Sequence, residues 1–117
     1  MPNYSENRPW GSFENLIDEP FCKVKKLVVL PGGRLSLQSH KNRDEHWVVV
    51  HGIATVTSLP RYEHAIVRYG SHVYIPRNTK HRLENFGKDV LILVEIQVGD
   101  SFEESDIIRY EDIYNRN

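Results

Sequence analysis

The sequence predicts an all-β fold in which short antiparallel strands form a barrel or a sandwich. Short apolar runs recur along the chain, and glycine, proline, asparagine or aspartate bounds them, as is typical of such folds. Residues 34–40 alternate strictly between two faces, which indicates a half-buried strand. Helical spacing occurs only in residues 103–115, and that stretch also fits a strand followed by an acidic turn.

We expect strands at residues 22–30, 34–40, 45–51, 53–58, 64–68, 72–75, 80–85 and 90–98. A Pro-Gly-Gly turn at residues 31–33 follows the first strand, and a polar turn at residues 41–44 follows the second. The third strand is rich in β-branched and aromatic residues and ends at Gly52. This regular succession of strands and turns favours one compact β structure.

The 117 residues are expected to form one domain, because domains usually contain about 100–150 residues. An N-terminal arm, residues 1–14, is expected to pack Trp10 and Phe13 onto the rim of the barrel. The barrel itself would span about residues 20–100, and residues 101–117 would form a C-terminal tail.

The charge of the chain is balanced, with 15 lysines and arginines against 16 aspartates and glutamates. This balance argues against nucleic acid or a membrane surface as a partner. The single cysteine, Cys22, cannot form an internal disulfide, and the N-terminal residues lack the apolar stretch of a secretory signal. The longest aliphatic run, residues 90–94, is far shorter than a membrane span. We therefore expect a cytoplasmic protein.

Four polar side chains form the constellation that is most relevant to chemistry. Gln38 and His40 point to the same face of their strand, and Glu45 would face them across a hairpin. His81 begins a strand much later in the chain. Two imidazoles, a carboxylate and an amide oxygen suit Zn, Fe, Mn, Co or Ni and leave coordination positions open. Taken singly, however, a histidine beside a glutamate on a strand is more often a surface ion pair.

The wider spacing of these residues favours the metal site over the ion pair, because it resembles the two motifs of cupins. Cupins are jelly-roll barrels, also called double-stranded β-helices. The motif positions are Gly32, Gln38, His40, Glu45 and Gly52, followed by Gly70, Pro76, Asn78, His81 and Asn85. Gln38 stands where many cupins have a histidine ligand, and Asn78 stands where a turn glycine is usual; asparagine tolerates the left-handed conformation. The resemblance implies a single cupin barrel.

Further segments resemble the C-terminal cupin domain of type II mannose-6-phosphate isomerases, which is fused to a mannose-1-phosphate guanylyltransferase in bifunctional enzymes. These segments are residues 8–11, 23–25, 31–38, 45–50, 74–76, 81–85, 94–99 and 106–112, together with His40 and Arg43. The resemblance extends over residues 8–116 and departs in residues 58–69 and at Asn42. The sequence has no glycine-rich nucleotide loop, so guanylyltransferase activity is not implied.

The resemblance implies interconversion of mannose 6-phosphate and fructose 6-phosphate, in which a proton moves between C1 and C2 through an enediolate. Gln38, His40, Glu45 and His81 correspond to the zinc ligands of these isomerases. Zinc is therefore the first expectation, with Mn, Fe, Co or Ni as alternatives. The metal would act as a Lewis acid, while a base near C1 and C2 and a cationic grip on the phosphate would complete the site.

Three cations are candidates for the phosphate grip. Arg34 lies on the ligand face of its expected strand, and a guanidinium suits bidentate contact with phosphate. Lys25 and Arg82 are further candidates. Each of the three could instead be a solvated surface cation.

The catalytic base is sought beside the ligands. Glu84 and His46 are candidates, with Arg34 as a third catalytic residue, although strict alternation points Glu84 and His46 away from the interior unless a bulge turns them in. Trp47 shares the inward parity of Glu45 and could stack on a sugar ring. Tyr74 could line the mouth of the barrel.

Two other functions remain open from the sequence. A stand-alone cupin could bind a sugar or sugar phosphate without catalysis. His40, Glu45 and His81 also form the two-histidine, one-carboxylate set of Fe(II) dioxygenases. Whichever function holds, edge strands of small cupins commonly pair between chains, so a homodimer is expected.

Overall fold

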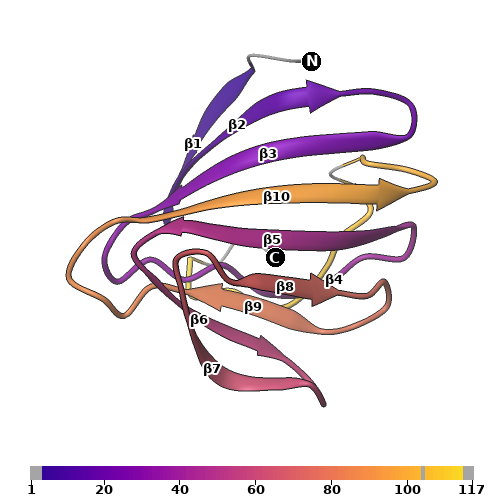
Figure 1. Ribbon diagram of the computed structural model, residues 1–117. Coiled ribbons are helices and arrows are strands. Elements are labelled where there is room, and N and C mark those ends of the chain that lie inside the picture. The colour runs from indigo at the N-terminus through magenta and orange to yellow at the C-terminus, as the bar shows by residue number, and fades with distance from the viewer. Residues whose placement is uncertain (1–3, 104, 115–117) are drawn as a thin grey trace.

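Two antiparallel sheets enclose the interior of the barrel in the computed structural model, which describes residues 4–103 and 105–114 (Figure 1). The larger sheet has the strand order β1-β2-β3-β10-β5-β8, and the smaller sheet has the order β11-β4-β9-β6-β7. This arrangement confirms the all-β barrel that the sequence predicts.

The strands of the larger sheet are β1 (Ser5–Arg8), β2 (Gly11–Asp18), β3 (Cys22–Val29), β10 (Leu91–Gly99), β5 (Arg43–His51) and β8 (His72–Ile75). Those of the smaller sheet are β11 (Ile108–Glu111), β4 (Leu37–Ser39), β9 (His81–Glu84), β6 (Ile53–Ser58) and β7 (Tyr62–Arg68). All eight expected strands are present, and their ends differ from the expected ones by at most three residues.

The N-terminal segment is more regular than the arm that we expected. It forms β1 and β2, which extend the larger sheet beyond β3. Phe13 and Asn15 are buried while their neighbours Ser12 and Glu14 are partly exposed, which is the alternation of a strand with one face inward. Trp10 and Phe13 belong to the buried core rather than to a rim. The first three residues of the expected arm lie outside the described part of the chain.

One further segment differs from the sequence prediction: the strand expected at residues 34–40 is regular only in β4, and Arg34 forms a separate bridge with Glu84. For residues 103–115 the sequence left a helix and a strand open, and the described portion forms the strand β11, which pairs with β4. Across the described residues no helix has the length and hydropathy needed to span a membrane.

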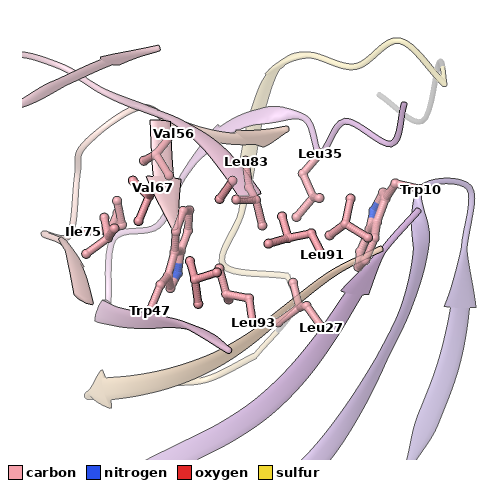
Figure 2. Close-up of a cluster of buried hydrophobic side chains, with 14 of the residues drawn as sticks. Trp10, Leu27, Leu35, Trp47, Val56, Val67, Ile75, Leu83, Leu91 and Leu93 are labelled. Carbon is pink, nitrogen blue, oxygen red and sulfur yellow. The ribbon is translucent and has the colours of Figure 1, made fainter. Parts of the chain in front are cut away.

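Apolar side chains from both sheets form a continuous core (Figure 2). The labelled members are Trp10, Leu27, Leu35, Trp47, Val56, Val67, Ile75, Leu83, Leu91 and Leu93. Their burial supplies the main favourable term for folding.

The interior changes from apolar to polar along the strands of the larger sheet. On β10 the buried positions are Leu91, Leu93, Glu95 and Gln97 in succession. Leu93 lies opposite Leu27 on β3, within the core, whereas Gln97 lies opposite Glu45 on β5. The apolar core therefore holds one end of the barrel together, while the other end presents inward-facing polar groups.

Two turns adopt the conformations that the motif residues require. Gly52 has a φ of 85°, and a Cβ there would lie 2.5 Å from the carbonyl oxygen of Val90, so only glycine fits. Asn78 replaces the usual turn glycine and has a φ of 61°, in the left-handed region. Its backbone N–H donates to the carbonyl oxygen of His40 at 2.7 Å. The turn before β9 is thereby held beside a predicted ligand.

Candidate metal centre

Three predicted metal ligands from different segments meet in the interior of the barrel. His40 follows β4, Glu45 lies in β5 and His81 begins β9. One ligand atom from each residue lies within 4.8 Å of those of the other two. All three residues are at most 5% exposed. Two imidazoles and a carboxylate at this spacing match the ligand types of Zn²⁺ and related divalent metals.

Hydrogen bonds to backbone carbonyls set the tautomer of both imidazoles. His40 Nδ1 lies 2.6 Å from the carbonyl oxygen of Asp106, and His81 Nδ1 lies 3.0 Å from that of Thr79. A carbonyl oxygen can only accept, so each Nδ1 carries the proton and each Nε2 carries a lone pair. His81 Nε2 is buried and has no hydrogen-bond partner among the residues that the structure describes. Both histidines are therefore arranged to bind a metal through Nε2.

The electrostatics of the three residues suit a cation. Burial lowers the pKa of both His40 and His81, against the attraction of Glu45, and so favours neutral imidazoles. Burial alone would raise the pKa of Glu45, but the positive charge of Arg43 and the hydrogen bond from Trp47 outweigh burial and hold that pKa below its ordinary value. Glu45 is consequently ionised at neutral pH.

Two neighbours hold the Glu45 carboxylate in place. Trp47 Nε1 donates to Oε1 at 3.0 Å, and Arg43 Nε donates to Oε2 at 3.0 Å. Arg43 Nη2 also lies 3.3 Å from His40 Nε2. Because His40 Nε2 has a single lone pair, Arg43 and a metal ion are alternative partners for that atom. The donor set and the unpartnered His81 Nε2 fit a divalent metal ion.

Gln38, the fourth predicted ligand, lies opposite His81 in the pairing of β4 with β9. It lines the same cavity as His40 and Glu45. Its position is thus compatible with the predicted role, which stays a prediction.

A cavity of about 110 Å³ opens beside the ligands. Four of its lining residues carry positive charges: Arg8, Lys25, Arg43 and Arg109. Arg109 Nε is buried and has no hydrogen-bond partner in the described structure. The walls therefore suit an anionic ligand.

Glu95 is a second buried carboxyl group on this cavity, and no motif predicted it. It lies opposite Lys25 on β3, and Gln97 Nε2 donates to its Oε2 at 2.5 Å. Burial, together with repulsion by Glu45, raises the pKa of Glu95 to about 8. Glu95 can therefore exchange a proton near neutral pH, whereas Glu45 cannot.

Residues 3–112 match the family described as mannose-6-phosphate isomerase C-terminal. The chain belongs to this family. The chain is also similar to the Xanthomonas campestris xanthan biosynthesis protein XanB, with 43% identity over 93% of this chain and 23% of that protein. The Salmonella typhimurium mannose-1-phosphate guanylyltransferase ManC is 42% identical over 93% of this chain and 22% of its own length. The chain thus spans about a quarter of the length of these relatives.

Solved structures confirm the cupin fold of this family domain. The capsular polysaccharide assembling protein CapF from Staphylococcus aureus superposes with a TM-score of 0.75 at 22% identity, over 96% of this chain and 32% of that one. The oxalate decarboxylase of Lactobacillus farciminis superposes with a TM-score of 0.77 at 20% identity, over 92% of this chain and 33% of that one. A double-stranded β-helix protein from Klebsiella pneumoniae also matches, with a TM-score of 0.72 at 15% identity, over 85% of this chain and 78% of that one.

Several other residues that the sequence nominated lie away from the cavity of this isomerase-family domain. Arg34 Nε donates to Glu84 Oε2 at 2.6 Å, and neither residue lines the cavity. Strand alternation predicted that the Arg34 side chain would point into the barrel. This does not hold, because the chain is not a regular strand before β4. The structure thus shows Arg34 and Glu84 as an ion pair outside the cavity lining, and their expected catalytic roles stay predictions.

Arg82 likewise makes contacts within the fold, and its expected substrate contact stays a prediction. Its Nε donates to the carbonyl oxygen of Leu35 at 3.0 Å, and its Nη1 lies 3.1 Å from Glu111 Oε1. Arg82 therefore ties β11 to β9. Lys25, in contrast, lines the cavity as expected, with Nζ 4.4 Å from the centre of the Phe13 ring.

His46 and Tyr74 stack on each other, with ring centres 4.9 Å apart, and neither lines the cavity. His46 alternates with the inward residues Glu45 and Trp47, so it projects to the other face of the sheet. There its Nδ1 forms a hydrogen bond with His72 Nε2 at 2.9 Å. Trp47 is part of the core and donates a hydrogen bond to Glu45, and its expected stacking on a sugar stays a prediction.

The cavity residues that sequence analysis missed are Arg8, Arg43, Glu95 and Arg109. For Glu95 a signal was present, because Leu91, Leu93, Glu95 and Gln97 share one parity on an otherwise apolar strand. A charged residue at an inward position is rarely tolerated without a function or a partner. Arg8 and Arg109 stand in the resembling segments 8–11 and 106–112, but alternation gave no reason to place them in the cavity, because only the fold brings these distant segments together.

Proposed function

We propose that this domain is a metal-dependent aldose–ketose isomerase of sugar phosphates, of the mannose 6-phosphate to fructose 6-phosphate class. The observation that carries the proposal is that two carboxyl groups with opposite pKa shifts line one cavity together with several cationic side chains. Glu45 is ionised beside two neutral histidines. Glu95 lines the same cavity, and its raised pKa of about 8 allows it to gain and lose a proton near neutral pH. Membership of the mannose-6-phosphate isomerase family supports the same assignment.

His40, Glu45 and His81 would hold the metal, with the amide oxygen of Gln38 as a fourth ligand. When bound, a divalent ion, zinc in the first instance, would polarise the substrate carbonyl and stabilise negative charge on its oxygen. Trp47 and Arg43 keep the Glu45 carboxylate oriented for this role.

Glu95 would carry the proton. In its ionised form it would remove the proton from C2 of the aldose and return it to C1, while a second proton passes from the C2 hydroxyl to the C1 oxygen, and together the two transfers convert the aldose into the ketose. A pKa of about 8 leaves both protonation states accessible near neutral pH, as a general acid–base catalyst requires. Burial excludes bulk water, which would otherwise exchange with the transferred proton.

Arg109 is the strongest candidate for the phosphate grip. It lines the cavity, and its buried Nε lacks a hydrogen-bond partner, so a phosphate oxygen would satisfy a donor that is otherwise left unpaired. Lys25 and Arg8 would add positive charge around the same cavity. Arg43 Nε and Nη2 are already engaged with Glu45 and His40, and only its Nη1 is buried without a partner among the described residues.

The proposal is tested by a coupled assay that converts mannose 6-phosphate with the zinc-loaded full chain. We expect turnover that Glu95→Gln lowers by about 100-fold without loss of metal, because the amide cannot accept the proton. Glu63→Gln, on the exposed face of β7, is the matched control and should retain full activity. A zinc-loaded protein that binds sugar phosphates without interconverting them would contradict the proposal, and so would oxygen consumption by an iron-loaded protein that is inert with sugar phosphates.

A further inference from the structure

The C-terminal segment forms part of the wall of the metal cavity. After β10 the chain turns back, and β11, in the yellow part of Figure 1, pairs with β4. In this pairing Ile108 lies opposite Ser39 and Arg109 lies opposite Gln38. Tyr110 forms a hydrogen bond with Ser39 at 2.9 Å between their hydroxyl groups. The segment therefore runs alongside the strand that leads into His40.

Asp106 contacts three consecutive residues at the end of β4. Its backbone carbonyl oxygen accepts from His40 Nδ1 at 2.6 Å. Its carboxylate accepts from the backbone N–H groups of Lys41 at 3.1 Å and Asn42 at 2.9 Å. The side chain thus fixes the turn after His40, while the main chain fixes the His40 ring.

The two histidines differ in how their tautomers are set. His81 bonds to Thr79, two residues away on the same turn, so its partner is supplied locally. His40 bonds to a residue 66 positions away in the sequence. The orientation of His40 therefore depends on docking of the C-terminal segment, and that of His81 does not.

We propose that Asp106 is a positioning residue for the metal centre, which fixes the Nδ1–H tautomer and the ring orientation of His40. The inference rests on the proposed metal-dependent function. Asp106 acts through His40: its carboxylate anchors the segment to the turn at Lys41 and Asn42, and this anchoring brings its own carbonyl onto Nδ1. Outer partners of this kind typically change metal affinity by about 10–100-fold.

The test compares Asp106→Ala with the wild-type full chain in two measurements. The first is the zinc affinity, obtained by competition with a chromophoric chelator. The second is the protonation state of the His40 and His81 ring nitrogens in the metal-free protein, obtained from ¹⁵N NMR. We expect zinc affinity to fall by about 10–100-fold, and His40 to lose its pure Nδ1–H tautomer while His81 keeps it.

Two further variants make the comparison specific. Asp100→Ala alters an exposed aspartate at the start of the same segment, which faces Arg77, and should bind zinc like the wild type. Asp106→Asn retains one acceptor oxygen for the two N–H groups, so its zinc affinity should be intermediate, and it tests the proposal even if the alanine variant does not fold.

The outcomes separate this inference from the proposed function. Wild-type zinc affinity and an unchanged His40 tautomer in the Asp106 variants would overturn the positioning role, even while His81→Ala abolished tight binding. If His81→Ala bound zinc as the wild type does, the metal centre itself, and with it the proposed function, would be refuted.

Discussion

Glu45 and Glu95 show how one cavity can make two identical functional groups behave differently. Glu45 accepts hydrogen bonds from Trp47 and Arg43, and its pKa is lowered to about 2. Burial and the charge of Glu45 raise the pKa of Glu95 to about 8. Pairs of titratable groups whose pKa values are pushed apart in this way are typical of acid–base active sites. One carboxylate is thereby suited to bind a metal and the other to transfer a proton.

The raised pKa of Glu95 predicts a specific dependence of stability on pH. The folded protein binds this proton more tightly than the unfolded chain, whose glutamate titrates near 4.5. The stabilisation is complete below pH 4.5 and is lost as the pH rises to about 8, at about 1.4 kcal/mol per pH unit. Urea unfolding of the metal-free protein across this range should show the wild type losing free energy of unfolding relative to Glu95→Gln. Parallel profiles for the two proteins would contradict the assignment.

At the scale of elements, the two cupin motifs meet through Asn85, which follows β9. Its backbone N–H donates to the carbonyl oxygen of Gly33, and its own carbonyl accepts from Gly32. The buried side chain donates to the carbonyl oxygens of Val29 and Asp89. The second motif therefore ends on the turn that begins the first, which keeps His81 and His40 on the same side of the barrel.

Asn85→Ala should accordingly lower the free energy of unfolding by about 3 kcal/mol, because it leaves buried carbonyl oxygens without donors. Urea denaturation measures this effect. Asn7→Ala, at an exposed position in β1, is the matched control and should change stability by less than about 0.5 kcal/mol. Equal stability of the two variants would show that Asn85 has no part in joining the motifs.

At the scale of the whole molecule, the sequence predicted what depends on local periodicity and on ligand spacing. Alternation located the barrel strands, and the spacing of Gln38, His40, Glu45 and His81 predicted a cluster of which the structure brings together three ligand atoms. Such features can be predicted from one sequence because the alternation of a strand and the chemistry of metal ligands restrict which residue types can occupy each position.

Features that depend on long-range partners could not be predicted in this way. Arg34 has a guanidinium group that suits phosphate, but this group pairs with Glu84, 50 positions later in the sequence. Arg82 similarly meets Glu111. The strand β11 is short and is stabilised by its pairing with β4 rather than by its own pattern. In each of these cases the decisive contact comes from tertiary structure, which a single sequence does not display.

The central claim is that His40, Glu45 and His81 bind one metal ion in the interior of the barrel. Elemental analysis of the full chain, purified without chelators and reloaded with zinc, tests it most directly. We predict one zinc per chain in the wild type and less than about a tenth of that in His81→Ala, since loss of one of the two histidine ligands abolishes tight binding. His51→Ala, which alters an exposed histidine paired with Asp89, should retain the full content. An unchanged zinc content in His81→Ala would contradict the account.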